Sequence, residues 1–489
     1  MKKSTIFSLL FMCASSAALC IVLVDAASYL PISTNSAVEK KVAAFYYPWY
    51  GNTTDYTQST PYPISDSASW WHWNSNGFTP PANACSTFTP ELGWYDSADP
   101  VAIEQHLRDA EWAGIDAFIC SFWGAGGGEF SRFQVMLNVA KNISSNMTFT
   151  IYYETGIADN KPDQEAIDKV ASDINTYYTT VMTPQFEDLI WKEEGKPVVW
   201  LYVVGWLAPQ VWSGAFENLT SEGHEIFAIA DRPGDSIDYL SLFDGSHEYD
   251  IYQRIRDDNY EDCFLTNRRN ARRNGMVYVA GVAPGYDDEV VRCCHEPLDR
   301  EGGKTYTDCW SRALSTYPDW ITITSWNEWH EGTEIEPSIE NGDLALNQTK
   351  EYINAWKIGD FEGTGLQVQS ITDMFLNENK IELLGFLLGW VMYAGLIVLF
   401  KKHPRGIKGT QPGFTWGIVM VCLSFALIVA HAFLAIEPDT SGFVKEYMLY
   451  LAAPGVVALN VIGSKLIEAR GEKNMRNEVP PNRTRNMQK

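Results

Sequence analysis

The sequence predicts an α/β fold, and more narrowly a barrel of eight parallel strands that alternate with helices. Several strand-like runs, such as 115–122, are almost continuously apolar, as in parallel strands that are buried on both faces. Helix-like patterns separate these runs, and polar or aromatic residues follow the end of nearly every run. A (β/α)₈ TIM barrel needs about 250 residues and carries its chemistry at the carboxyl ends of its strands. The 489-residue chain is long enough to hold one.

The strands and helices are placed by apolar runs and by helix start and stop signals. Asp99-Pro100 predicts a helix start and Gly114 its end, with an apolar face between them. The eight predicted strands are 42–50, 115–122, 149–153, 197–204, 225–230, 240–243, 276–282 and 320–325. The other predicted helices are 164–181, 209–219, 261–274 and 309–316.

The last predicted strand continues into the richest cluster of functional side chains. Residues 326–336 contain two tryptophans, one histidine and four glutamates. On a helical turn, the Cβ atoms of Glu328 and Glu331 would lie about 5–6 Å apart. Carboxyl groups about 5–5.5 Å apart suit retaining cleavage of a glycosidic bond, and about 6.5–9.5 Å suits inverting cleavage. Indole faces beside them would pack against sugar rings, so we expect a carbohydrate site here.

Four motifs make the chain similar to glycoside hydrolase family 99, the endo-α-1,2-mannosidases and mannanases. They are FYYPWYG at 45–51, the segment 114–124, PGYDD at 284–288 and, most specifically, SWNEWHEGTEIEP at 325–337. The resemblance covers residues 41–358. It implies a (β/α)₈ barrel that needs no metal or other cofactor and cleaves α-mannosidic bonds inside a glycan with retention of configuration.

The resemblance also implies roles for particular residues. Glu331 matches the general acid/base, and Glu328 matches the carboxylate that deprotonates the sugar's own 2-hydroxyl to form a 1,2-anhydro sugar. The positions expected to contact substrate are Tyr46, Trp123, Glu154, Tyr249, Tyr252, Asn327 and His330. Two alternatives stay open: hydrolysis of a different α-linked surface polysaccharide, and a membrane-anchored glycan receptor without turnover.

Apolar segments at both ends predict export and membrane attachment. Residues 1–27 combine two lysines with an apolar run, which is typical of a signal peptide or signal anchor. Three apolar stretches, 383–400, 414–436 and 447–463, are each long enough to cross a bilayer. Linkers are expected at 28–40 and 359–382. The basic tail 464–489 should be cytoplasmic, which places the barrel in a Golgi-like lumen or outside the cell.

Charge and cysteine content narrow the possible partners. The formal net charge of −24 disfavours nucleic acid and is compatible with a neutral glycan. Five sequons, at Asn52, Asn142, Asn146, Asn218 and Asn347, are compatible with a glycosylated ectodomain. At least one disulfide is expected in the cluster of Cys263, Cys293, Cys294 and Cys309. Cys120, inside an apolar strand, is predicted to be a free buried thiol.

Overall fold

The structure is a computed structural model that describes residues 39–56, 62, 64, 67–257, 260–292 and 296–369. The predicted signal segment, the three apolar stretches and the basic tail lie outside these residues. Among the described residues, no helix has both the length and the apolar character needed to cross a bilayer. The described residues all belong to one compact unit.

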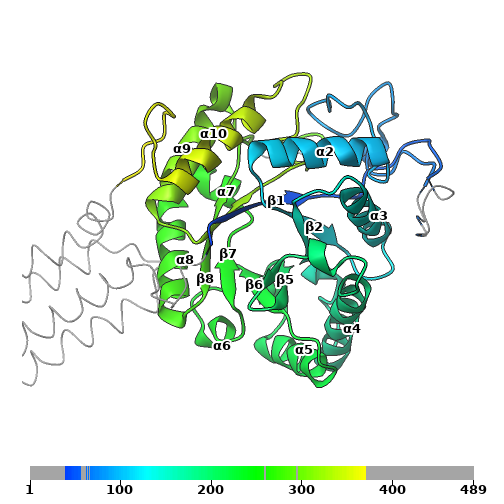
Figure 1. The fold of residues 1–489 in the computed structure, drawn as a ribbon, viewed down its shortest axis with the longest axis vertical. Helices are drawn as coiled ribbons and strands as arrows, with labels where there is room; N and C mark the ends of the chain where they lie inside the picture. Colours follow the sequence, from blue (N-terminus) through cyan, green and yellow to red (C-terminus); the bar gives the residue numbers. More distant parts are fainter. Residues whose placement is uncertain are drawn as a thin grey trace, which may run out of the picture. The chain divides into compact units, whose positions relative to one another are not determined.

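Eight parallel strands form a closed barrel, as the sequence predicts (Figure 1). In order around the barrel they are β1 (Lys41–Tyr46), β2 (Ala117–Phe122), β3 (Thr148–Tyr153), β5 (Lys196–Leu201), β6 (Phe227–Asp231), β7 (Gly245–His247), β8 (Val277–Val282) and β9 (Trp320–Ile323). The first and last strands pair, with Lys41 opposite Trp320, which closes the barrel. The short β4 (Lys192–Glu193) lies outside this ring and pairs antiparallel with β5.

Helices surround the strands in Figure 1. They are α2 (Pro100–Ala113), α3 (Gly128–Asn142), α4 (Asp163–Val181), α5 (Pro209–Ser221), α6 (Ile237–Leu240), α7 (Ile251–Arg256), α8 (Tyr260–Asn274), α9 (Lys304–Ser315) and α10 (Leu344–Ile358). The predicted start of α2 is confirmed, because the Asp99 side chain accepts the N–H of Val101 at 2.9 Å. Its end is confirmed as well, because Gly114 adopts the left-handed conformation with φ 85°.

Side chains alternate along each strand between the barrel interior and the helix layer. In β1, Phe45 belongs to the interior cluster, together with Tyr152 and Trp200. Its neighbour Tyr46 belongs to the outer cluster that packs under the helices. Tyr47 is again on the interior side. This alternation decides which aromatic residues can reach the mouth of the barrel.

Three aspartates that each precede a strand bind the start of a neighbouring strand at the amino-terminal end of the barrel. Each carboxylate accepts the partner's backbone N–H, and each aspartate's own N–H donates to the same partner's carbonyl. The carboxylate bonds join Asp116 to Val42 (2.8 Å), Asp244 to Ala228 (2.8 Å) and Asp319 to Tyr278 (2.9 Å). The reciprocal bonds fix the register of β1 with β2, β6 with β7, and β8 with β9.

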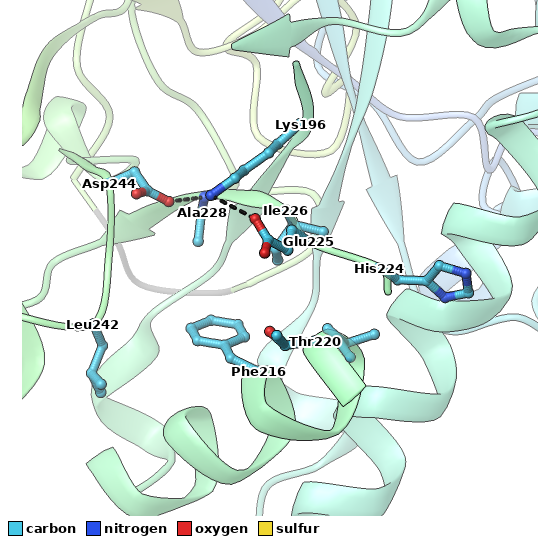
Figure 2. A pocket seen from close by; sticks show the side chains of 10 residues that line it. Lys196, Phe216, Thr220, His224, Glu225, Ile226, Ala228, Leu242 and Asp244 are labelled. Carbon is cyan, nitrogen blue, oxygen red and sulfur yellow. Dashed lines mark hydrogen bonds and ion pairs between the residues drawn. The ribbon is translucent and has the colours of Figure 1, made fainter. Parts of the chain in front are cut away.

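A cation lies beside each of these aspartates. Arg272 contacts both carboxylate oxygens of Asp319, at 2.6 and 3.0 Å. Lys357 contacts both oxygens of Asp116, at 2.7 and 2.8 Å. Lys196 lies beside Asp244 in a cavity of about 270 Å³ between β5, β6 and α5 (Figure 2). Burial raises the pKa of Asp244, and the charge of Lys196 opposes that rise.

The predicted sixth strand, 240–243, is wrong. Residues 237–240 form α6, and the strand comes later, as the short β7. Leu240 and Phe243 are apolar because they are buried against other helices, and the ring of Phe243 meets that of Trp212 in α5 at 6.0 Å. The true strand consists of Gly245, Ser246 and His247, which give no apolar signal.

Of the four cysteines among which a disulfide is expected, two form none. Cys263 and Cys309 are free thiols, and Cys293 and Cys294 lie outside the described residues. Cys309 is buried and Cys263 is partly buried, and burial raises the pKa of Cys309 to about 12. The prediction for Cys120 is confirmed, since this thiol is free and fully buried inside β2.

Candidate active site

The segment that follows β9 is held by its own hydrogen bonds and by the exit of β1. Ser325 and Thr333 close the base of the loop, with the N–H of Ser325 donating to the Thr333 carbonyl at 2.8 Å. The N–H of Trp326 donates to the carbonyl of Phe45 at 2.7 Å. The N–H of Glu331 donates to the carbonyl of Glu328 at 3.2 Å, so these two glutamates share one turn. The loop therefore presents both carboxylates from a fixed backbone.

Glu328 is almost completely buried. Its Oε1 accepts the backbone N–H of His330 at 3.2 Å, and its own N–H donates to the Ser325 hydroxyl at 2.8 Å. Its Oε2 has no hydrogen-bond partner among the described residues. Burial first, and then the charge of Glu331, raise the pKa of Glu328 well above its usual value. A buried carboxyl oxygen without a partner is costly in a merely structural residue.

Glu331 shares this incomplete hydrogen bonding but has a cationic neighbour. Its Oε1 accepts from the guanidinium of Arg292 at 2.8 Å, and its Oε2 has no partner among the described residues. Burial raises the pKa of Glu331, and Arg292 opposes that rise. Arg292 also donates to Tyr286 Oη and Asp288 Oδ2, both at 3.2 Å, while its side chain stays 51% exposed. The loop after β8 thus brings a half-exposed cation to the candidate acid.

Aromatic rings surround the two glutamates. The hydroxyls of Tyr47 and Tyr249 are 2.5 Å apart. Burial raises the pKa values of both phenols, and the charges of Glu328 and Glu331 raise them further. The ring of Tyr252 stacks on that of Tyr286, with centroids 3.9 Å apart and planes 9° apart. Next to burial, Glu331 is the largest cause of the raised pKa of Tyr252. These rings therefore lie close to the carboxylates.

A third carboxylate, Glu154, lies at the end of β3. It is 7% exposed, and its Oε1 accepts from the Ser121 hydroxyl at 2.7 Å. Burial raises its pKa to about 8, with smaller contributions from the charges of Glu331 and Asp231. Glu154 is therefore a neutral hydrogen-bond donor and acceptor near pH 7, which suits contact with a sugar hydroxyl.

Histidine and indole rings form another part of the same mouth. His330 Nε2 lies 3.0 Å from the carbonyl of His72, and because a carbonyl only accepts, that nitrogen carries the proton. The ring of His72 stacks on that of Trp49, with centroids 4.6 Å apart. Burial lowers the pKa of His330 to about 4, so its imidazole is neutral at physiological pH.

Comparison with known proteins decides the family. The family model described as Glycosyl hydrolase family 99 matches residues 37–353, which is more than half of the chain. The chain belongs to glycosyl hydrolase family 99. It is 29% identical over 329 residues to the glycoprotein endo-α-1,2-mannosidase of Rattus norvegicus, covering 61% of this chain and 68% of that protein. It is 28% identical to the human glycoprotein endo-α-1,2-mannosidase-like protein, over 60% of this chain and 68% of that one.

A solved structure of family 99 shares the fold. The GH99 endo-α-mannosidase from Bacteroides thetaiotaomicron superimposes with a TM-score of 0.53 at 22% identity, covering 65% of this chain and 97% of the bacterial one. Family membership and the mannosidase relatives make this chain a glycoside hydrolase. Within the described residues, no group of three or more His, Cys, Asp or Glu side chains is arranged to hold a metal ion.

The structure places most of the predicted family 99 site residues at the carboxyl ends of the strands. Glu328, Glu331, Glu154, Tyr249, Tyr252 and His330 lie in or beside the mouth described above. Trp123 follows β2 and is 44% exposed, as a residue of the rim should be. Contact of these side chains with a sugar stays a prediction.

Two predicted substrate contacts occupy other places. Tyr46 points into the helix layer, where its hydroxyl lies 3.0 Å from His106 Nδ1. Its neighbour Tyr47 takes the position at the mouth, because strand residues alternate in direction. Asn327 is fully buried, and its amide binds the backbone N–H and carbonyl of Tyr47 at 2.7 and 3.2 Å. Asn327 thus positions the exit of β1 and has no free face for a sugar.

The residues that sequence reasoning missed have long-range partners. Arg292 is 39 positions from Glu331, and no local pattern marks it as a partner of the acid. Tyr47 was within reach of sequence reasoning, since counting every second residue from the interior Phe45 leads directly to it.

Proposed function

We propose that this family 99 enzyme is a retaining endo-acting hydrolase that cleaves internal α-1,2-mannosidic bonds in N-glycans or mannan. Glu331 protonates the departing oxygen and later activates water. Glu328 removes the proton of the sugar's 2-hydroxyl, so that O2 attacks the anomeric carbon and closes a 1,2-anhydro ring as the glycosidic bond breaks. Water then opens that ring, and two inversions at the anomeric carbon give net retention.

The observation that carries this proposal is the pair of unpartnered carboxylate oxygens. Glu328 Oε2 and Glu331 Oε2 are both buried, and neither has a hydrogen-bond partner among the described residues. A substrate hydroxyl and a glycosidic oxygen would supply the two missing partners. The endo-α-1,2-mannosidase relatives support mannose as the sugar.

The proposed reaction begins with the proton on Glu331, whereas the surroundings of the two glutamates without substrate favour the proton on Glu328. Without substrate, Arg292 stabilises the charged form of Glu331, while the basic group beside Glu328 is the neutral His330 ring, with Nδ1 4.0 Å from Oε1. The proposed roles require a protonated Glu331 and a charged Glu328. Binding of a sugar that displaces the half-exposed Arg292 would remove the stabilising charge from Glu331. Positive charge that develops at the anomeric carbon would then favour ionised Glu328.

Substitution of each glutamate by glutamine separates the two roles. With a glycan substrate, Glu331→Gln should lower kcat about 10²- to 10⁴-fold, the usual contribution of general acid catalysis. With an activated aryl leaving group, which needs no protonation, much of the first-step rate should return. Glu328→Gln should be inactive on both substrates. The measurement is release of products from a glucosylated high-mannose N-glycan, α-mannan and an aryl glycoside by the full-length protein.

Glu340→Gln is the matched control, because this exposed glutamate follows the same loop. Its carboxylate accepts the backbone N–H of Thr89 at 2.7 Å and the Thr89 hydroxyl at 2.9 Å. It should retain the wild-type rate. Nearly full activity of Glu328→Gln would disprove participation of the 2-hydroxyl. Binding of glycans without any turnover by the wild type would instead favour a receptor, and turnover of another α-linked polysaccharide alone would change the substrate.

We also propose that residues 383–463 hold the enzyme in a membrane, with the barrel in a lumen or outside the cell. The support is the sequence alone, in which basic segments follow the first and third apolar stretches, at 401–412 and 464–489, and the loop 437–446 between the second and third is acidic. In sealed microsomes that contain the full-length protein, an epitope on the tail should be accessible to protease while the barrel is protected. Protection of both, or digestion of both, would contradict this topology.

A further inference from the structure

A row of aromatic rings leads from the two glutamates to the rim of the barrel. Tyr249 is the inner ring of the row. Burial, and then the charges of both glutamates, raise its pKa, and its ring meets that of Tyr202 edge-on at 6.0 Å. Tyr202 meets the ring of Trp206 edge-on at 5.3 Å. Tyr202 directly follows β5, and Trp206 ends the short helix η4 (Val204–Trp206). The row therefore runs outward along the exit of one barrel strand.

The outer end of this row is open to solvent. Trp206 is 48% exposed. Among the described residues, the other exposed tryptophans are Trp71, Trp123 and Trp112, and the first two also lie in segments that follow barrel strands. Only Trp112 is on a helix of the outer ring, where Lys350 covers its indole at 3.7 Å. Exposed indoles thus gather at the end of the barrel that carries the glutamates.

The turn that carries Tyr202 and Trp206 has a strained backbone. Val203 has φ 38°, a left-handed conformation that is rare for a β-branched residue. The carbonyl of Val203 accepts the N–H of Trp206 at 3.0 Å, and the carbonyl of Tyr202 accepts from the Thr155 hydroxyl. Such strain persists only where surrounding contacts enforce it, and it concentrates at functional sites.

One buried carboxylate links this turn to the candidate catalytic centre. Asp231 at the end of β6 is fully buried, and its Oδ2 accepts the N–H of Val203 at 3.1 Å. Its Oδ1 accepts the N–H of Tyr249 at 3.0 Å. The same side chain therefore sets the position of the inner ring of the row and of the turn that bears the outer two rings.

We propose that Tyr202 and Trp206 form a further sugar-binding subsite that takes a hexose of the glycan chain beyond the residues next to the cleaved bond. This subsite rests on the proposed function. The occupant is a sugar, because the rings extend outward from the candidate catalytic centre and end in an exposed indole whose flat apolar surface suits the C–H face of a pyranose. Burial first, and then the charge of Asp250, raise the pKa of Tyr202, so the Asp250 carboxylate, which is 15% exposed and pairs with Arg232 at 2.7 Å, lies close to this ring as an acceptor for sugar hydroxyls.

The test measures kcat/KM of the full-length protein on α-1,2-linked manno-oligosaccharides of increasing length. Wild type should gain activity at the length that first reaches the subsite. Trp206→Ala should lose that gain, about five- to tenfold on the longer oligosaccharides, and should match wild type on the shortest one cleaved. Trp206→Phe, which keeps an aromatic face, should recover most of the gain. Trp112→Ala removes an equally exposed indole outside the row and should match wild type at every length.

Each outcome decides one of the two proposals. If wild type cleaves the series and Trp206→Ala reduces all lengths alike, or none, the subsite is wrong. If wild type cleaves no member of the series, the α-1,2-mannosidic specificity of the proposed function is wrong. Loss confined to longer oligosaccharides, with recovery by phenylalanine, supports the subsite.

Discussion

At the amino-terminal end of the barrel, Asp116, Asp244 and Asp319 each accept a backbone N–H and lie beside a lysine or arginine. At the carboxyl-terminal end, Glu328 and Glu331 are buried, and each keeps one oxygen without a partner among the described residues. The first arrangement satisfies acceptors and fixes strand register. The second leaves charge and hydrogen-bonding capacity for a ligand. In this (β/α)₈ barrel, the carboxylate group thus serves stability at one end and chemistry at the other.

The comparison predicts that the amino-terminal end carries the larger share of stability. Asp319→Ala removes the acceptor of the Tyr278 N–H and leaves Arg272, which is 5% exposed, without its bidentate partner. Breaking such a buried pair should lower the free energy of unfolding by about 3 kcal/mol. Chemical denaturation of the full-length protein measures this loss, and kcat/KM per folded molecule should not change.

Two controls sharpen this result. Lys196→Met removes the charge beside Asp244 and the 3.0 Å contact with the half-exposed Glu225, and because Lys196 is itself 36% exposed, it should cost about 0.5 kcal/mol or less. Glu328→Gln at the opposite end should abolish activity without lowering the free energy of unfolding. If Glu328→Gln proved as destabilising as Asp319→Ala, the two ends would not differ in the way described.

A smaller effect is expected from Arg292, which pairs with Glu331 at 2.8 Å much as the cations at the amino-terminal end pair with their aspartates. Its positive charge favours ionised Glu331, so Arg292→Gln should raise the pKa of Glu331 further. The protonated acid would then persist to higher pH. The alkaline limb of the pH profile of kcat/KM should therefore move upward for substrates that need protonation of the leaving group, and stay in place for an activated aryl glycoside.

Arg254→Gln is the matched control for this pH profile. Arg254 is 35% exposed and pairs with Glu248 at 3.3 Å, in the segment that follows β7. Its loss should leave the alkaline limb where it is. If Arg292→Gln leaves the alkaline limb of the pH profile in place but raises KM, then Arg292 acts by binding substrate and does not set the pKa of Glu331.

Sequence reasoning was sufficient for the barrel and for the loop of residues 325–337. Continuous apolar strands and the capped helix after Asp99 are local signals, and the density of glutamate and tryptophan marked the catalytic loop. It failed where the decisive contact is distant or the signal is weak. Leu240 and Phe243 form no strand because a neighbouring helix buries them, and the short polar β7 resembles a loop.

The candidate site was predictable in type more than in detail. The glutamates were found from their place after the last predicted strand, and Tyr249 was predicted from the resemblance to family 99. The resemblance pointed to Tyr46, whereas the alternation of side chains along β1 turns Tyr46 to the helix layer and Tyr47 to the interior. Asn327 stands next to Glu328 in the sequence, which made it a candidate substrate contact. Its amide instead binds the backbone of Tyr47, a contact between residues 280 positions apart.

The catalytic loop is held by bonds from the last strand to the first, through Trp326 with Phe45 and Asn327 with Tyr47. During synthesis the first strand leaves the ribosome almost three hundred residues before its partner does. An unfinished or truncated barrel therefore cannot assemble the pair of glutamates, however well its other strands have folded. Hydrolysis by this enzyme is for that reason a direct report that the whole barrel has been made and closed.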